Sequence, residues 1–252
     1  MANPSEKIAF VTGASSGVGK VVAKHLASLG YCVAVGYTHN EHNAQAVVRE
    51  INTKANNAGF AIHIDYSDLS SVKQAVSSVE QHFNGSISLL VNNGAIAQEK
   101  DYLTITEDDF NRMINTNLAG PFFACQQVIP AMLENKYGKI INISSIGGQW
   151  GGVNQLHYAA AKAGLINLTK SLAKLYSAKG ISSHCIAIGL VETEMSKREL
   201  ATEAGKQKVA NIPSGRLATK EEIAETISFL VSDNANYLSG QTLNMNGGML
   251  FN

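Results

Sequence analysis

The sequence predicts an α/β domain built on a doubly wound, seven-stranded parallel sheet with helices on both faces. Short apolar runs rich in β-branched residues recur along the chain, and segments with helical periodicity separate them. The runs are almost continuously apolar, which is typical of parallel strands covered on both faces. The predicted strands are 8–12, 32–37, 60–65, 89–92, 139–144, 182–188 and 241–245.

The segments between these runs supply the helices that connect parallel strands by right-handed crossovers. The predicted helices are 17–29, 44–56, 70–83, 107–136, 158–179 and 220–233. Residues 189–215 are long for a connection and mixed in character, so we interpret them as a substrate lid. We expect residues 1–252 to form a single domain that binds a dinucleotide and carries out catalysis.

Composition excludes several classes of function. The 252 residues hold 20 basic and 20 acidic side chains, so no overall field attracts nucleic acid or an anionic membrane. No apolar stretch approaches the roughly 20 residues of a membrane span, and the N-terminus lacks the regions of a signal peptide. We therefore expect a cytoplasmic protein.

The cysteines and histidines give no indication of a metal site. Cys32, Cys125 and Cys185 are odd in number and embedded in apolar runs, as expected for core residues in a reducing compartment. The seven histidines lack convincing metal-ligand spacing. We expect no bound metal.

A glycine-rich turn follows the first predicted strand directly. Residues 12–19 read TGASSGVG, and an amphipathic helix comes next. Glycines at such a turn allow backbone N–H groups and a helix N-terminus to approach a pyrophosphate. The turn therefore predicts a dinucleotide site. Its candidate residues are Gly13, Ser15, Ser16, Gly17, Val18 and Gly19.

The end of the second strand bears on the choice of cofactor. Proteins that select NAD usually place a carboxylate there for the ribose 2′-hydroxyl, but the chain reads YTHN at 37–40. Ser16, Thr38, His39 and Asn40 could donate to a 2′-phosphate, although no Arg or Lys occupies the obvious positions. We therefore favour NADPH over NADH. Asp65 could accept from an adenine amino group or cap the next helix.

A tyrosine and a lysine lie four residues apart in YAAAK, at Tyr158 and Lys162. In a helix they share one face, and a nearby cation favours the phenolate, lowering the tyrosine pKa from its usual value of about 10. The pair could then act as a general acid or base. The alternative is a surface helix with a half-buried tyrosine and a snorkelling lysine.

Ser145 lies thirteen residues before Tyr158, at the end of a predicted strand. In an open parallel sheet the ligand crevice lies at the carboxyl ends of the strands, so Ser145 should face the site. Ser144 is the weaker candidate because alternation along the strand directs it to the other side.

These motifs, together with Asn92-Asn93 and Asn117 in the same order and spacing, resemble the short-chain dehydrogenase/reductase family. The resemblance extends from Ile8 to Gly248 and implies a Rossmann fold. The C-terminal part is most similar to the β-ketoacyl carrier-protein reductases of fatty acid synthesis.

The resemblance implies a role for each catalytic candidate. Tyr158 would protonate the carbonyl oxygen as hydride arrives, while Ser145 holds that oxygen. Lys162 would lower the tyrosine pKa and bind the nicotinamide ribose, and the Asn117 carbonyl would hold a water that passes protons to the lysine. Val191 and Thr193 would fix the carboxamide. The further cofactor candidates are Tyr37, Thr38, Asp65, Tyr66, Asn92, Gly94, Gly189, Tyr158 and Lys162.

The implied activity is NADPH-dependent reduction of a β-ketoacyl thioester, carried by acyl carrier protein or CoA. Reduction of a free ketone and oxidation of a polyol or other secondary alcohol are alternatives. A catalytically silent dinucleotide-binding partner protein is a third. Retention of Ser145, Tyr158 and Lys162 argues against that last interpretation.

Pro121 gives a physical reason for the role of Asn117. Pro121 lies four residues after Asn117 and has no N–H. If one helix continues through both residues, the Asn117 carbonyl therefore lacks its usual i+4 hydrogen bond and is free to bind water. Alternatively, Pro121 begins a new helix after a break.

Two positions depart from the family pattern. The usual NNAG is Asn92-Asn93-Gly94-Ala95 here, and the Pro-Gly that normally follows the sixth strand is Ile188-Gly189. If the fourth position of the first motif needs a glycine backbone, Ala95 costs about 1 kcal/mol. We expect these changes to affect cofactor affinity more than chemistry.

Two surfaces are expected to meet other molecules. Lys136, Lys139 and Lys179 should lie near the mouth of the active site, and in reductases that accept acyl carrier protein, basic residues at the positions of Lys136 and Lys179 meet its acidic helix. Lysines near helix ends also complement the helix dipole. The family further suggests a homotetramer.

The substrate side should be lined by Ile96, Trp150, Val153, Gln155, Leu190 and the lid around Met195.

Overall fold

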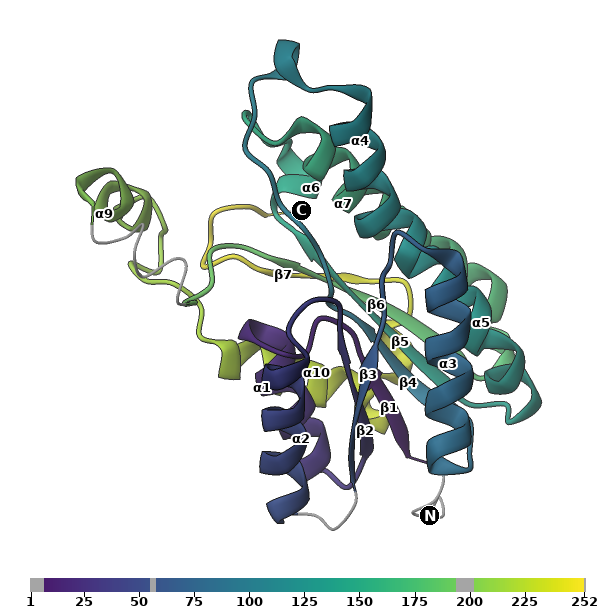
Figure 1. Ribbon diagram of the computed structural model, residues 1–252. Helices are drawn as coiled ribbons and strands as arrows, with labels where there is room; N and C mark the ends of the chain where they lie inside the picture. Colours follow the sequence, from purple (N-terminus) through teal and green to yellow (C-terminus); the bar gives the residue numbers. More distant parts are fainter. Residues whose placement is uncertain (1–6, 55–57, 194–201, 252) are drawn as a thin grey trace.

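A single parallel sheet organises the chain. The computed structural model describes residues 7–54, 58–193 and 202–251, and its seven strands lie in the order β3-β2-β1-β4-β5-β6-β7 (Figure 1). Every pair is parallel, which confirms the predicted fold class. The strands are β1 (Ile8–Val11), β2 (Cys32–Tyr37), β3 (Gly59–His63), β4 (Ile87–Asn92), β5 (Gly138–Ser145), β6 (Ile181–Ile188) and β7 (Thr242–Met245).

Helices cover both faces of this sheet (Figure 1). One face carries α1 (Gly17–Ser28), α2 (Glu41–Lys54) and α10 (Lys220–Val231), and the other carries α3 (Leu69–Phe83), α5 (Gly120–Glu134) and α7 (Leu156–Tyr176). The order of the strands reverses between β1 and β4. Such a switch point opens a crevice at the carboxyl ends of the two strands, where ligands bind in open α/β sheets.

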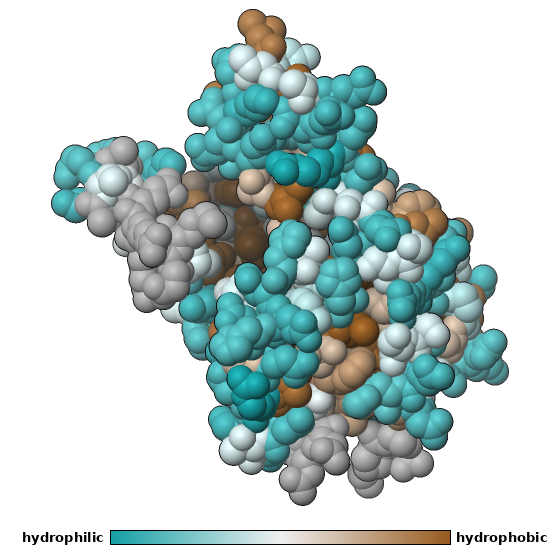
Figure 2. Space-filling model, viewed as in Figure 1, coloured by the Kyte–Doolittle hydropathy of each residue, from teal (hydrophilic) through white to brown (hydrophobic). Residues whose placement is uncertain are grey.

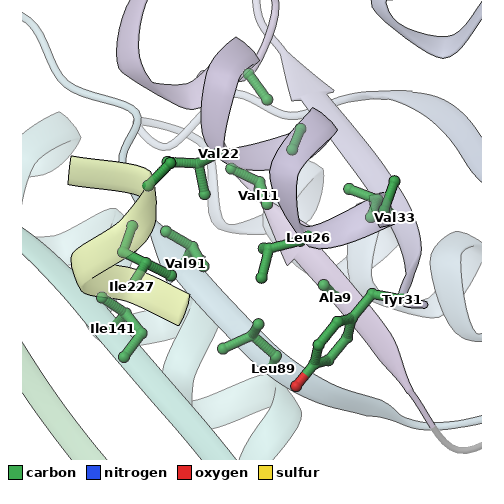
Figure 3. Packing of buried hydrophobic residues seen from close by; sticks show 14 of the residues in the cluster. Ala9, Val11, Val22, Leu26, Tyr31, Val33, Leu89, Val91, Ile141 and Ile227 are labelled. Atoms are coloured by element: carbon green, nitrogen blue, oxygen red, sulfur yellow. The ribbon is translucent and has the colours of Figure 1, made fainter. Parts of the chain in front are cut away.

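Alternation along β1 divides the core between the two faces. Ala9 and Val11 belong to the cluster under α1 and α10, where they lie near Val22, Leu26 and Ile227 (Figure 3). Ile8 and Phe10 belong to the cluster on the opposite face. Full burial of a side chain such as Val11 or Phe10 contributes roughly 1.5–3 kcal/mol to the free energy of folding. Packing on both faces therefore holds the strand ends that form the crevice.

The predicted helix 107–136 is one helical run with a local change of pitch. It consists of α4 (Glu107–Ile114), a π-helical segment (Asn115–Ala119) and α5. The helix therefore runs through without a break, and Pro121 lies just after the π-helical segment and has no N–H to give to the Asn117 carbonyl. Single π-helical turns of this kind are frequent at functional sites.

The predicted lid is described only in part. Residues 194–201, including Met195, lie outside the described residues, whereas α9 (Glu203–Ala210) projects away from the sheet (Figure 1). Val191 and Ala218 form a bridge at the base of the segment. In the part of the chain that the structure describes, no helix is long and apolar enough to cross a membrane.

Candidate active site

The candidate site lies where the carboxyl ends of β1, β4, β5 and β6 meet. These ends carry the glycine turn, the segment after Asn92, Ser145 and Gly189, respectively. Figure 2 shows a recess with hydrophobic surface between the region of α9 and the body of the molecule. Residues predicted from separate parts of the sequence therefore meet at one edge of the sheet.

Ser145 and Tyr158 are brought together as predicted. Ser145 is the last residue of β5, and Tyr158 lies in the first turn of α7. Their hydroxyl groups are hydrogen-bonded, and Ser145 Oγ also accepts from the Gly147 N–H at 3.1 Å. The serine is thereby oriented by the backbone of α6 (Gly147–Trp150) toward the tyrosine.

Lys162 lies one turn further along α7, on the same side as the phenol. Its side chain is only 3% exposed, and its Nζ lies 5.7 Å from the centroid of the Tyr158 ring. The ammonium donates to the Ile143 carbonyl at 2.8 Å. Burial lowers its pKa to about 8, because the charged form is poorly solvated there.

The pKa of Tyr158 moves in the direction opposite to the prediction. Burial raises it, and this effect exceeds the lowering by the hydrogen bond from Ser145. At neutral pH the phenol therefore keeps its proton, which is the form that can donate to a carbonyl oxygen.

Asn117 occupies the π-helical segment and is fully buried. Its side chain makes a reciprocal pair of hydrogen bonds with Ile96, accepting from the backbone N–H at 2.9 Å and donating to the carbonyl at 2.7 Å. Asn117 thus holds the segment after β4 against the long helix. Its own carbonyl cannot receive an N–H from Pro121, as the sequence predicts.

The glycine turn fits the pyrophosphate of a dinucleotide. Gly13 and Gly17 have φ values of 61° and 57°, and Ser16, the N-cap of α1, makes no side-chain capping bond. The first N–H groups of α1 therefore keep their capacity to bind an anion. A Cβ on Gly13 would lie 2.7 Å from Gly94 Cα, so the turn and the end of β4 touch through two glycines.

Comparison with known proteins identifies the family of this chain. The sequence model of a family described as enoyl-(acyl carrier protein) reductase matches residues 13–250. The chain belongs to the short-chain dehydrogenase/reductase family. Members of this family are NAD(P)-dependent oxidoreductases, and so is this chain.

Two curated relatives span almost the whole reductase. The 3-oxoacyl-(acyl-carrier-protein) reductase FabG of Staphylococcus aureus (strain N315) is 40% identical over 243 residues, which cover 96% of this chain and 98% of the relative. The enzyme of the same name from Escherichia coli (strain K12) is 38% identical over 243 residues, covering 96% and 97%. The similarity therefore extends over almost the whole chain.

A buried polar network missed by the sequence analysis supports the short-chain reductase fold beneath the crevice. The Tyr66 hydroxyl donates to Asn92 Oδ1, Asn92 Nδ2 donates to Asn142 Oδ1 at 2.8 Å, and Asn142 Nδ2 donates to Thr169 Oγ1 at 2.9 Å. The side chains of the predicted cofactor residues Tyr66 and Asn92 are thus occupied inside the protein. Polar residues in otherwise apolar strands were the available signal for this network.

Asp65 does not cap the following helix, so that alternative is wrong. Its Oδ1 accepts from the backbone and the hydroxyl of Ser67 at 2.8 and 2.7 Å, forming a local turn. The N-cap of α3 is Asp68, which accepts from the Ser70 N–H. The adenine interaction of Asp65 stays a prediction. Thr38 donates its hydroxyl to the Ile64 carbonyl at 2.8 Å.

The exchanged Gly94-Ala95 pair causes no strain here. A Cβ at Gly94 would lie 3.3 Å from the Gly13 nitrogen, so the small residue belongs at this position. Ala95 is exposed, and among the described residues the only non-glycine positions with positive φ are Asn84 and Lys136. The cost predicted for Ala95 therefore does not arise. Gly189, after the changed Ile188, packs against the backbone of Asn246.

The three lysines are not at the mouth of the cleft in this chain, contrary to expectation. Lys136 and Lys179 are exposed and precede the amino ends of β5 and β6, whereas Ser145 lies at the carboxyl end of β5. Seven residue steps of about 3.3 Å separate those ends by roughly 23 Å. Lys139 is buried, and its Nζ donates to Asn236 Oδ1 at 2.8 Å and to the Ser232 carbonyl at 3.0 Å. It caps the end of α10.

The residues expected to line the substrate side have different exposures. Trp150 and Leu190 are 50% and 39% exposed, and Val153, in the loop before α7, is 91% exposed. Ile96 and Gln155 are partly buried. Val191 is buried and forms the bridge to Ala218, and Thr193 is the last residue described before position 202.

The glycine contacts predict a selective defect for Gly19→Ala. The new Cβ would lie 2.5 Å from both the Gly13 carbonyl oxygen and Asn93 Nδ2, and the backbone cannot move away without opening the turn. We expect about 1–3 kcal/mol lower stability in urea unfolding and at least tenfold weaker binding of the dinucleotide in titration calorimetry.

Gly30→Ala is the matched control. Gly30 has φ 86° but no atom within 4 Å of the added Cβ, so the variant should lose roughly 1–2 kcal/mol and bind the dinucleotide normally. Equal cofactor affinity in the two variants would contradict the assignment of the turn.

Proposed function

We propose that this chain catalyses the NADPH-dependent reduction of a β-ketoacyl thioester, on acyl carrier protein or CoA, to the β-hydroxyacyl thioester. The observation that carries the proposal is the hydrogen-bonded Ser145–Tyr158 pair beside the buried Lys162. Its support is the 40% identity, over 96% of the chain, to enzymes named 3-oxoacyl-(acyl-carrier-protein) reductase. Residues 1–252 act as one unit, with 189–215 as the substrate lid.

The side chains divide the work at the carbonyl oxygen. A bound nicotinamide cofactor supplies the hydride to the carbonyl carbon. Ser145 and Tyr158 donate hydrogen bonds to the oxygen, and the phenolic proton passes to it as negative charge develops. Lys162, protonated below a pKa of about 8, stabilises the phenolate that remains. Water at the Asn117 carbonyl returns a proton toward Lys162.

NADPH is the preferred cofactor because the end of β2 presents no free carboxylate among the described residues. The nearest acid along the chain, Glu41, accepts a hydrogen bond from the Tyr37 hydroxyl. Ser16, His39 and Asn40 are exposed and offer polar groups to a 2′-phosphate, whereas the Thr38 hydroxyl already donates to the Ile64 carbonyl. A 2′-phosphate would therefore meet donors and no unpaired acid.

The deciding experiment is a steady-state screen that follows loss of the reduced nicotinamide. We expect acetoacetyl-CoA and acetoacetyl carrier protein to be reduced, with kcat/KM at least tenfold higher for NADPH than for NADH. A trans-2-enoyl thioester and a free ketone form two further arms. Turnover only of the enoyl thioester, or only of the free ketone, would overturn the proposed substrate.

We also propose a homotetramer in which Lys136 and Lys179 guide an acidic carrier protein. The two residues lie side by side, since the Gly138 N–H donates to the Gly180 carbonyl at 3.2 Å between them. Because their own cleft is roughly 23 Å away, a carrier held there would present its acyl group to the cleft of a neighbouring subunit.

Charge reversal tests this docking surface. Lys136→Glu with Lys179→Glu should raise KM about tenfold for the carrier-bound substrate and leave KM for acetoacetyl-CoA within twofold. The effect should shrink as salt increases, since exposed charges are screened. Lys54→Glu, on α2, is the control. Equal losses on both substrates would contradict docking at the pair.

A further inference from the structure

The segment after β4 is attached to its surroundings at alternate residues. Ile96, Gln98 and Lys100 are partly buried, whereas the residues between them are exposed. Ile96 bonds to Asn117, and the Lys100 backbone N–H donates to the Asn154 carbonyl at 2.8 Å. Gln98, the middle attachment, connects α4 with the start of α7.

The Gln98 amide has a defined orientation. Its Nε2 donates to Asp109 Oδ1 at 2.9 Å, and a carboxylate can only accept. Gln98 Oε1 must therefore accept from His157 Nε2, 3.0 Å away. Asp109 is itself held by the ammonium of Lys100 and by the capping box with Thr106. The chain Asp109–Gln98–His157 thus begins at a fixed helix end.

His157 is the residue immediately before Tyr158, and it is only 2% exposed. Its Nδ1 is buried and has no partner among the described residues, so the bond to Gln98 is its one polar attachment there. The N-cap of α7, Gln155, makes no side-chain capping bond. The first turn of α7 therefore lacks a side-chain N-cap, and the hydrogen bond between His157 and Gln98 holds it in place instead.

We propose that Gln98 and His157 are positioning residues that set the first turn of α7 and thereby the place of the Tyr158 hydroxyl against Ser145. The inference rests on the proposed function, because it takes Tyr158 as the proton donor. Displacement of a reacting group by about 1 Å can cost about a hundredfold in rate. Loss of this attachment therefore lowers kcat without altering cofactor binding.

Two removals and one conservative replacement test the attachment. Gln98→Met and His157→Phe remove it, whereas His157→Gln keeps an amide donor at a similar reach. We expect kcat to fall at least tenfold in each removal, with KM for NADPH within twofold. The double variant should be no worse than the poorer single, because both act through one bond. His157→Gln should recover most of kcat.

Asn52→Ala is the matched control, because Asn52 makes two hydrogen bonds with Gly59 that tie α2 to β3, remote from α7. Hydrogen exchange of the free protein gives a second readout that needs no substrate. Amides 158–162 should exchange faster in both removals and unchanged in Asn52→Ala.

The inference is wrong if Gln98→Met and His157→Phe keep normal kcat, or if their losses add in the double variant. It is also wrong if Asn52→Ala loses as much kcat, or if exchange at amides 158–162 is unchanged. Failure of the proposed function is distinguishable from all of these. It appears as absence of β-ketoacyl reduction in the wild type, and exchange in the free protein still decides whether the attachment holds α7.

Discussion

Tyr158→Phe is expected to reduce kcat for β-ketoacyl reduction by roughly a hundredfold to ten-thousandfold, with little change in cofactor affinity. The substitution removes one oxygen atom, the hydroxyl hydrogen-bonded to Ser145. With it goes the proposed general acid, and general acid catalysis typically contributes a factor of this size. Single-turnover rates with NADPH and acetoacetyl-CoA measure the loss, and calorimetric titration of NADP⁺ measures cofactor binding.

Tyr31→Phe is the control for a lost phenolic oxygen. Tyr31 is 5% exposed, lies beside Leu89 and Ala9 in the core (Figure 3), and is hydrogen-bonded to Tyr137. Its variant should keep wild-type turnover. A Tyr158→Phe protein that oxidised NADPH as fast as wild type would disprove the proton-donor role.

Lys162→Met is expected to abolish turnover and yet leave the free protein at least as stable as wild type at pH 7. Burial lowers the lysine pKa from 10.5 to about 8, a shift equivalent to about 3 kcal/mol. Removing the charge relieves that penalty, and the lost hydrogen bond to Ile143 offsets only about 1 kcal/mol.

The pH dependence follows from the same shift. Below pH 8 both folded and unfolded chains carry the Lys162 proton, so the penalty is complete. Between about pH 8 and 10.5 the unfolded chain binds more protons, and the stability of the wild type rises relative to the variant. The advantage of Lys162→Met in urea unfolding should therefore shrink across this window. A constant difference from pH 7 to pH 10 would contradict the depressed pKa.

Local sequence was sufficient to predict features that depend on interactions within a single strand, helix or turn. Apolar runs identified all seven strands, and their ends differed by at most two residues, as for predicted 182–188 against Ile181–Ile188. The spacing of Tyr158 and Lys162 follows from helix geometry alone. The glycine turn could likewise be recognised, because positive φ at Gly13 and Gly17 requires residues without a side chain.

Predictions that depended on distances between elements were less reliable. The lysines were expected at the cleft from the family resemblance, although Lys136 and Lys179 precede the predicted strands and so lie at the ends opposite to Ser145. The pKa of Tyr158 was expected to fall because proximity to a cation could be inferred from spacing, whereas burial could not. The network from Tyr66 to Thr169 crosses several elements, so no local spacing indicates it.

By itself, the sequence identified the candidate site residues and the elements that hold them, since periodicity, glycine placement and helix spacing are properties of short segments. Only the tertiary structure decided how those residues behave. Burial of Lys162 sets its pKa near 8, and the Gln98–His157 bond joins the segment after β4 to the start of α7. Each depends on solvation or on contacts between segments distant in the chain, and neither is encoded in a local pattern.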